Sequence, residues 1–142
     1  MSGQLAFALM ATLTASSCYA SEVDIELGKQ WAKCSTQADI FQTLSKSAEE
    51  AERLKKTSNL LHIYAIAAAG KEVVRSERAD TKAAFYKGII EDDVAKRAVY
   101  LKAFYAQAQT DLKTCSGSFV QNQTRFKTNV HEILERSKLR KP

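Results

Sequence analysis

The feature that most constrains the fold of this chain is an unbroken heptad spacing of apolar residues over 94–115. These residues, called the heptad seam below, recur at alternating intervals of four and three: Val94, Ala98, Leu101, Tyr105, Ala108, Leu112 and Cys115. Such spacing puts them along one side of an α-helix that packs against another helix. No alternating pattern of useful length predicts a strand, and a single proline, at position 142, argues against a turn-rich β protein.

Three helices are expected before the seam helix and one after it. The first begins near residue 22, or at a Thr36 capping box, and its pattern extends to about residue 56. Polar residues 57–59 interrupt the pattern and supply caps for a second helix over about 60–75, and a short third helix follows over about 80–90. Gly117 is well placed to end the seam helix. The last helix is marked by Phe119, Phe126, Val130, Ile133 and Leu134.

The first 20 residues carry no Asp, Glu, Lys or Arg, although the rest of the chain is highly charged. Their apolar stretch over 5–13 and small residues up to Ala20 are typical of a secretory signal peptide, although a basic start is missing. We therefore expect residues 1–20 to be cleaved, leaving 21–142 as one helical domain that is periplasmic or secreted. Two alternatives are a buried N-terminal helix in a cytosolic protein and a lipoprotein anchored through Cys18.

Removal of residues 1–20, or lipidation of Cys18, leaves two thiols, Cys34 and Cys115. In an exported protein, two such thiols favour a disulfide. The alternative is a pair of buried free thiols. Bridged cysteines have Cα atoms within about 7 Å. We expect Cys34 to lie at the start of the first long helix, and an unbroken helix over 80–115 in an up-down bundle would carry Cys115 to the opposite end. We therefore predict a break near Asp92 and an all-α, antiparallel bundle of four to five helices with one disulfide.

No pattern of catalytic, cofactor-binding or metal-binding residues emerges, so an enzyme, a cofactor and a metal site are not expected. His62 lies in an apolar helix and His131 among polar residues, which separates the two. The acidic clusters at 49–52 and 91–93 have charged or polar neighbours, whereas a catalytic acid needs a desolvated carboxyl group. They are better explained as a solvated helix face and a helix N-terminus.

The net charge of +5 belongs entirely to the last 30 residues, since 21–112 hold 14 acidic and 14 basic residues and 113–142 hold 2 and 7. The basic C-terminal tail, about 136–142, offers contacts to anionic lipid or a cell-wall polymer through Lys138, Arg140 and Lys141. A solvated tail is the simpler explanation. Nucleic acid is not an expected partner, because no basic pattern interleaved with exposed aromatics is present.

Aromatic residues give the one indication of a binding face. Tyr100 and Phe104 form an i, i+4 pair beside the seam, where they either pack against a neighbouring helix or form a groove for a partner. We expect a protein-protein interaction module of accessory, inhibitor, immunity or chaperone-like type, whose partner is another protein of the envelope or extracellular space. The alternative is a carrier that holds a small apolar ligand between helices lined by Tyr64, Tyr100 and Phe104.

Overall fold

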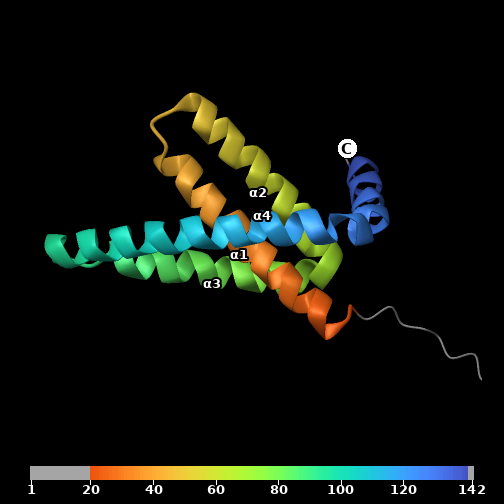
Figure 1. Cartoon of the computed structure of the whole chain (residues 1–142), viewed down its shortest axis with the longest axis horizontal. Coiled ribbons are helices and arrows are strands. Elements are labelled where there is room, and N and C mark those ends of the chain that lie inside the picture. The colour runs from red at the N-terminus through yellow and green to blue at the C-terminus, as the bar shows by residue number, and fades with distance from the viewer. Residues whose placement is uncertain (1–19, 141–142) are drawn as a thin grey trace, which may run out of the picture.

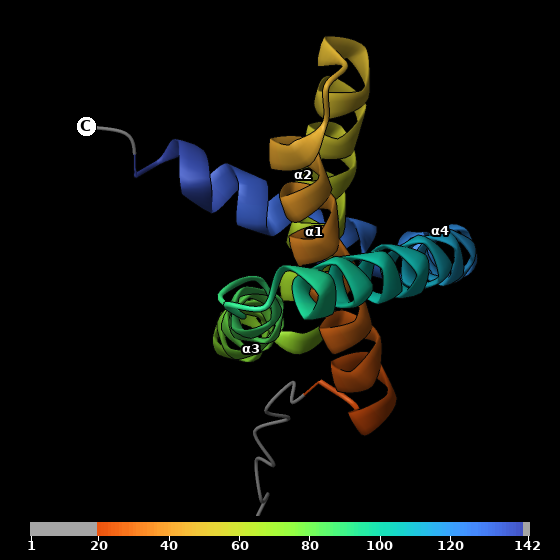
Figure 2. The same ribbon diagram turned by 90° about the vertical axis from the view of Figure 1, so that its left-hand side faces the viewer.

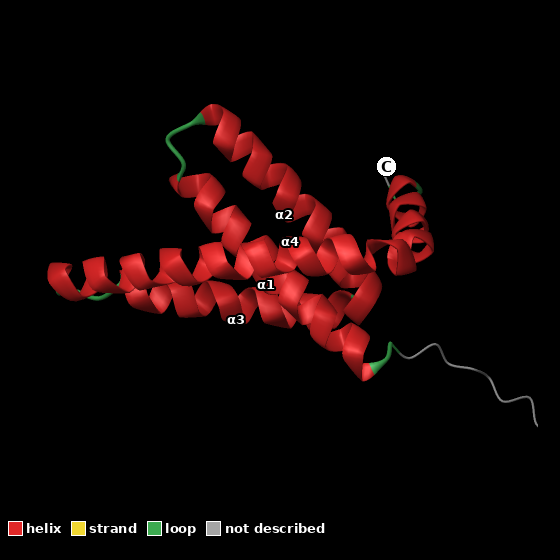
Figure 3. Cartoon of the chain, in the orientation of Figure 1, coloured by secondary structure: helices red, strands yellow, loops and turns green. Residues whose placement is uncertain are grey.

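The computed structural model describes residues 20–140, which form four α-helices and no strand (Figure 3). The helices are α1 (Glu22–Leu44), α2 (Ala48–Ala69), α3 (Lys71–Ile89) and α4 (Val94–Lys138). A bond between Cys34 and Cys115 joins α1 to α4. The predicted all-α bundle with one disulfide is confirmed. The predicted signal peptide and Cys18 lie outside the described residues, apart from Ala20.

The helices form two antiparallel hairpins that cross each other, α1 with α2 and α3 with α4 (Figure 1). When the first hairpin stands upright, the second points toward the viewer (Figure 2). The loop end of the second hairpin extends beyond the first hairpin on the left of Figure 1. We call this end of the hairpin, residues 82–105, the arm; at its base, Phe104 and Tyr105 contact Phe41 of α1.

The first chain reversal comes earlier than the sequence predicted, at residues 45–47 instead of 57–59. Ser47 begins α2 because its side chain accepts a hydrogen bond from the N–H of Glu50, in a Ser-x-x-Glu capping pattern. The expected breakers lie inside α2 instead. Thr57 donates to the carbonyl of Arg53, and Ser58 is buried against Ser35 of α1. These polar groups find partners within the helix and its neighbour, so they do not end it.

The second and third predicted helices are also placed wrongly. Gly70 ends α2 and precedes α3 directly, with a φ of 86° that side-chain-bearing residues rarely adopt. The chain turns there without any loop, and α3 runs on past Asp80, which does not begin a helix.

The predicted break near Asp92 is confirmed, because α3 ends at Ile89 and Asp93 caps α4 through the N–H groups of Ala95 and Lys96. Gly117, by contrast, does not end the seam helix, which continues to Lys138 and includes the predicted last helix. The helix changes direction in its blue part (Figure 1).

The change of direction in α4 has a local cause. In this part of the helix Ser118 donates to the carbonyl of Cys115, and Asn122 donates to that of Ser118. A glycine flanked by serines, with side chains competing for helix carbonyls, favours bending. Bending replaces the predicted stop, and it brings Phe126 and Val130 into the core.

The core is centred on Trp31 of α1, which is 0% exposed. Its ring meets three aromatic rings edge-on, with centroids 5.7–6.2 Å away: Tyr64, Phe119 and Phe126. Its indole N–H donates to Ser118 Oγ at 3.0 Å, which satisfies the buried polar group. One residue of α1 therefore joins α2 to both parts of the bent α4.

Small residues let α1 and α2 approach closely. A Cβ atom at Gly28 would lie 2.4 Å from the Cβ of Ala69 and 2.9 Å from the carbonyl oxygen of Ala65. Ala32, Ala65 and Ala69 are buried at the same contact. Any larger side chain at position 28 has to push the two helices apart.

We predict that Gly28→Ala lowers the free energy of unfolding by about 1–3 kcal/mol, because the new methyl group overlaps α2. Gly117→Ala is the matched control, since nothing lies within 4 Å of its added Cβ and it sits inside α4. There the change should raise stability by about 0.5–1 kcal/mol. Urea unfolding followed by circular dichroism measures both. A neutral Gly28→Ala would contradict the close helix contact.

We also predict that replacing Cys34 and Cys115 together by alanine lowers stability by about 4 kcal/mol, because the bridge closes a loop with a sequence separation of 81. Reduction of the wild type should give a similar loss, and the reductant should leave the double variant unchanged. A loss below about 1 kcal/mol would show that the bridge does little to restrict the unfolded chain.

Candidate functional site

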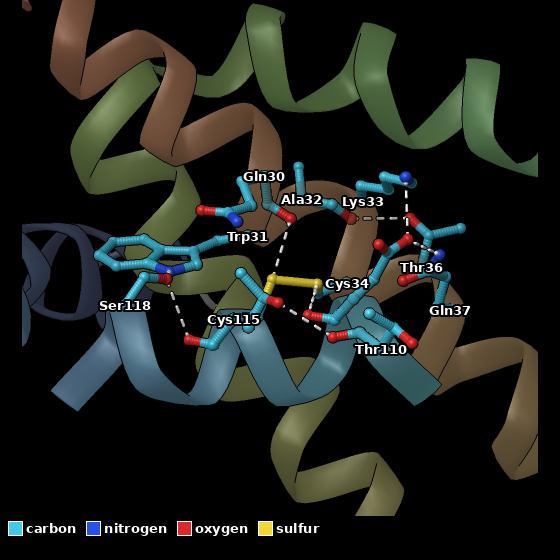
Figure 4. Close-up of a disulfide and its surroundings, with 12 residues drawn as sticks. Gln30, Trp31, Ala32, Lys33, Cys34, Thr36, Gln37, Thr110, Cys115 and Ser118 are labelled. Carbon is cyan, nitrogen blue, oxygen red and sulfur yellow. Dashed lines mark hydrogen bonds and ion pairs between the residues drawn. A yellow bond between two sulfur atoms is a disulfide. The ribbon is translucent and has the colours of Figure 1, made fainter. Parts of the chain in front are cut away.

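The disulfide lies at the crossing of α1 and α4, beside the indole of Trp31 (Figure 4). The two Cα atoms are 6.6 Å apart, and both cysteines are buried. Cys34 lies in the middle of α1. The sequence-based prediction that Cys34 starts a helix is therefore wrong. A buried bridge surrounded by packed side chains has a structural role, and no free thiol is available at these two positions for nucleophilic chemistry.

A carboxylate next to the bridge collects three donors. Asp111 of α4 accepts from Gln37 at 2.8 Å, from Lys33 at 2.9 Å and from Gln107 at 2.9 Å. Burial acts to raise the pKa of Asp111, but the hydrogen bonds from these side chains outweigh it and lower the pKa below its usual value. A carboxyl group held ionised in this way is suited to joining α1 to α4 and poorly suited to donating a proton.

A polar cluster that sequence analysis missed joins α1, α2 and α3. Arg78 of α3 forms an ion pair with Asp39 and donates to the hydroxyl of Ser35. Ser35 in turn bonds to the carbonyl of Ser58, and His62 lies with Nδ1 3.4 Å from Arg78 Nη1. Asp39 and Ser35 are four residues apart on α1, a spacing that the sequence shows. Their common partner is 39 or more residues away, so the pattern alone does not identify it.

His62 is half-buried in this cluster. Burial lowers the pKa of His62, and the positive charge of Arg78 adds to the effect, while Asp39 opposes it. The neutral imidazole therefore prevails at neutral pH. His131 is exposed on α4 and is not part of the cluster.

The aromatic residues predicted to form one binding face belong to two different places. Tyr64 is 8% exposed and packs in the core against Trp31 and Phe119. Tyr100 and Phe104 lie in the arm against α3, where Tyr100 donates to the carbonyl of Ala84. The structure therefore brings Tyr100 and Phe104 together and leaves Tyr64 apart.

The packing of this pair explains why α3 and α4 run side by side. Phe104 packs on Phe85 with ring centroids 4.7 Å apart, and the Tyr100 ring fills the space beside Gly88 that any Cβ would occupy. Both residues also line a pocket of about 370 Å³, together with polar side chains that include Lys33 and Glu77.

The heptad seam is buried at one end and exposed at the other. Ala108 and Cys115 are buried, with Leu112 half-buried between them. In the arm, Ala98 is exposed, and Val94 and Tyr105 are 68% and 36% exposed. We call Val94, Ala98, Leu101 and Tyr105 the open seam. Val94 and Ala98 of this apolar, helix-pairing pattern are exposed, whereas Leu101 is half-buried and Tyr105 stacks on Phe41 of α1 with ring centroids 5.0 Å apart.

The three basic residues predicted to contact anionic surfaces have different surroundings. Lys138 ends α4 and forms an ion pair with Glu135 at 2.7 Å. Arg140 lies near Lys71 of α3, with which it lines a pocket. Lys141 lies outside the described residues. Of the three predicted contact residues, Arg140 alone lines this pocket, together with Arg136 and Ser137 of the same tail.

Over residues 20–140, no group of three metal-binding side chains comes together. None of the helices there has a stretch that is both long and apolar enough to cross a bilayer.

Comparison with protein-family models, curated proteins and solved structures finds no match to this chain. The function therefore has to be argued from the chain's own surfaces.

We predict that acidification destabilises the protein through His62. Because its pKa is lowered in the folded state, the unfolded chain binds a proton near pH 6.5 that the folded chain does not yet bind. Stability should therefore fall as the pH drops through that value. His62→Gln should remove this part of the pH dependence in urea unfolding, whereas His131→Gln should leave it. If wild type and His62→Gln showed the same dependence of stability on pH, His62 would not be the group responsible.

Proposed function

We propose that this chain is an exported, non-catalytic interaction module that binds a helix of another envelope or extracellular protein along the open seam. The observation that carries the proposal is the continuity of the heptad seam from the core into solvent. Accessory, inhibitor, immunity and chaperone-like roles all use such a surface.

A heptad seam is a pattern for pairing with another helix. In its buried half, the pattern is satisfied by packing within the bundle around Ala108 and Cys115. The open seam keeps the same spacing on the projecting arm, where Val94 and Ala98 are exposed. An amphipathic helix from a partner, with apolar residues at heptad spacing, covers such a stripe and buries its apolar area.

Charge narrows the choice of partner. Residues 94–110 contain Lys96, Arg97 and Lys102 and no carboxylate. A partner helix with acidic residues beside its apolar stripe is therefore favoured. A second copy of this chain is disfavoured, because an antiparallel pairing that sets Val94 opposite Tyr105 also sets Arg97 of one copy opposite Lys102 of the other.

Two observations support export. Disulfides persist in oxidising compartments, and this chain has one between α1 and α4. Cleavage after Ala20 would make Ser21 the first residue, and Ser21 caps α1 by accepting from the N–H of Asp24. The predicted processed chain thus begins with the residue that its first helix needs.

We predict that a synthetic amphipathic peptide of about three heptads, with Leu at the core positions and Glu beside them, binds the full chain. Val94→Ser should weaken binding roughly tenfold, because a buried valine contributes about 1.5 kcal/mol. Val120→Ser is the matched control, since Val120 is also on α4, is 67% exposed and lies off the seam. Fluorescence anisotropy of the labelled peptide measures all three affinities.

The same assay tests the charge preference of the open seam. A peptide with Lys in place of each Glu should bind the wild type more weakly, and Lys96→Glu with Lys102→Glu should reverse that preference. Equal losses in Val94→Ser and Val120→Ser, or no binding of either peptide, would refute the proposal. Analytical ultracentrifugation showing a dimer that Val94→Ser abolishes would instead make a second copy the occupant.

A further inference from the structure

Two adjoining pockets lie on a part of the molecule that the open seam does not include. One, of about 360 Å³, is lined by residues of α2 and α3, and the other, of about 380 Å³, extends to the last turn of α4 and the tail. They share Ile66 and Lys71, so together they form one groove. Each volume is in the range of small-molecule sites. We call this pair the basic groove.

The groove has a cationic lining. Lys71, Arg75, Arg78 and Lys82 line the first pocket, and Arg136 and Arg140 join Lys71 in the second. No carboxylate lines either pocket. A cluster of like charges is unfavourable in an empty site, and an anionic ligand relieves that repulsion.

Some of these cations already have partners outside the groove. Arg75 pairs with Glu72 at 3.0 Å and Arg78 with Asp39. Among the ion pairs of residues 20–140, none involves Lys71 or Lys82. Arg140 is also absent from these ion pairs, so Lys71, Lys82 and Arg140 are the cations of the groove most available to a ligand.

The groove also has apolar walls. Ile66 belongs to both pockets, with Ala79 in the first and Ile133 in the second. An inorganic anion alone would leave this apolar surface exposed to water. A ligand with a charged head and an apolar body would cover both kinds of lining.

We propose that the basic groove binds an anionic phospholipid, with its phosphate held by Lys71, Lys82 and the neighbouring guanidinium groups, and its acyl part against Ile66 and Ile133. Guanidinium groups bind phosphate oxygens through paired hydrogen bonds, and lysine contributes a point charge. This site is separate from the partner-helix surface and does not depend on it. It also differs from the predicted tail contacts, since Arg140 alone is shared.

The first test uses the full chain and dihexanoylphosphatidylglycerol below its micelle concentration. Lys71→Gln with Lys82→Gln should weaken binding roughly tenfold or more, at the contribution expected of two basic residues near an anionic headgroup. Lys55→Gln with Lys127→Gln removes the same net charge from exposed positions outside the groove. Isothermal titration calorimetry compares the variants, and unfolding curves check that each variant folds.

The two histidines report where the ligand lies. His62 lines the first pocket and His131 lines neither. In NMR spectra, the ring signals of His62 should shift on titration with the short-chain lipid, and those of His131 should move much less. Equal shifts at both rings, or none, would overturn the placement of the ligand in the groove.

Further measurements distinguish binding of a lipid from binding of inorganic phosphate. Phosphatidylglycerol vesicles should bind the wild type more tightly than phosphatidylcholine vesicles, with the same order among variants. Ile133→Ser should weaken lipid binding while leaving any weak binding of inorganic phosphate unchanged. Equal weakening by the two double-lysine variants would mean diffuse attraction only. Binding of inorganic phosphate as tight as that of the lipid would mean that the apolar walls take no part. Either result overturns the proposal.

Discussion

The fold depends on how α1 is held against α4. Trp31 and Cys34 lie one turn apart on α1, and both reach α4, through a hydrogen bond to Ser118 and a covalent bond to Cys115. Because α4 bends after this contact, its last turns fold back to cover the same indole with Phe126. One turn of α1 thus fixes the crossing of the two hairpins by a hydrogen bond, a covalent bond and aromatic packing.

Sequence reasoning recovered the fold class, the bridge and the turn near Asp92, because these follow from periodicity, cysteine number and chain direction. It misplaced the remaining boundaries for a common reason. Ser47 and Thr57 are equally polar, yet only Ser47 is followed three residues later by a glutamate in a capping pattern. Gly70 and Gly117 look alike in sequence, but only Gly70 has a positive φ. Such differences depend on local hydrogen bonds and on packing.

The surfaces were harder to foresee than the elements. The heptad seam is evident in sequence, but its division into a buried and an open half depends on where α1 crosses α4. Tyr64 and Tyr100 look like equivalent anchors, and only the crossing of the hairpins separates them. The basic groove joins Lys71 to Arg140, which are far apart in the chain and belong to different helices. No local pattern predicts such a pairing.

The position of the bridge has a consequence for proteolysis. Cys34 and Cys115 enclose all of α2, all of α3 and the exposed arm loop at residues 90–93. A protease that cleaves the chain once in this loop divides it into two polypeptides, yet the fragments remain one covalent molecule under oxidising conditions. A single cut in the arm loop therefore separates neither half of this protein from the other while the bridge is intact.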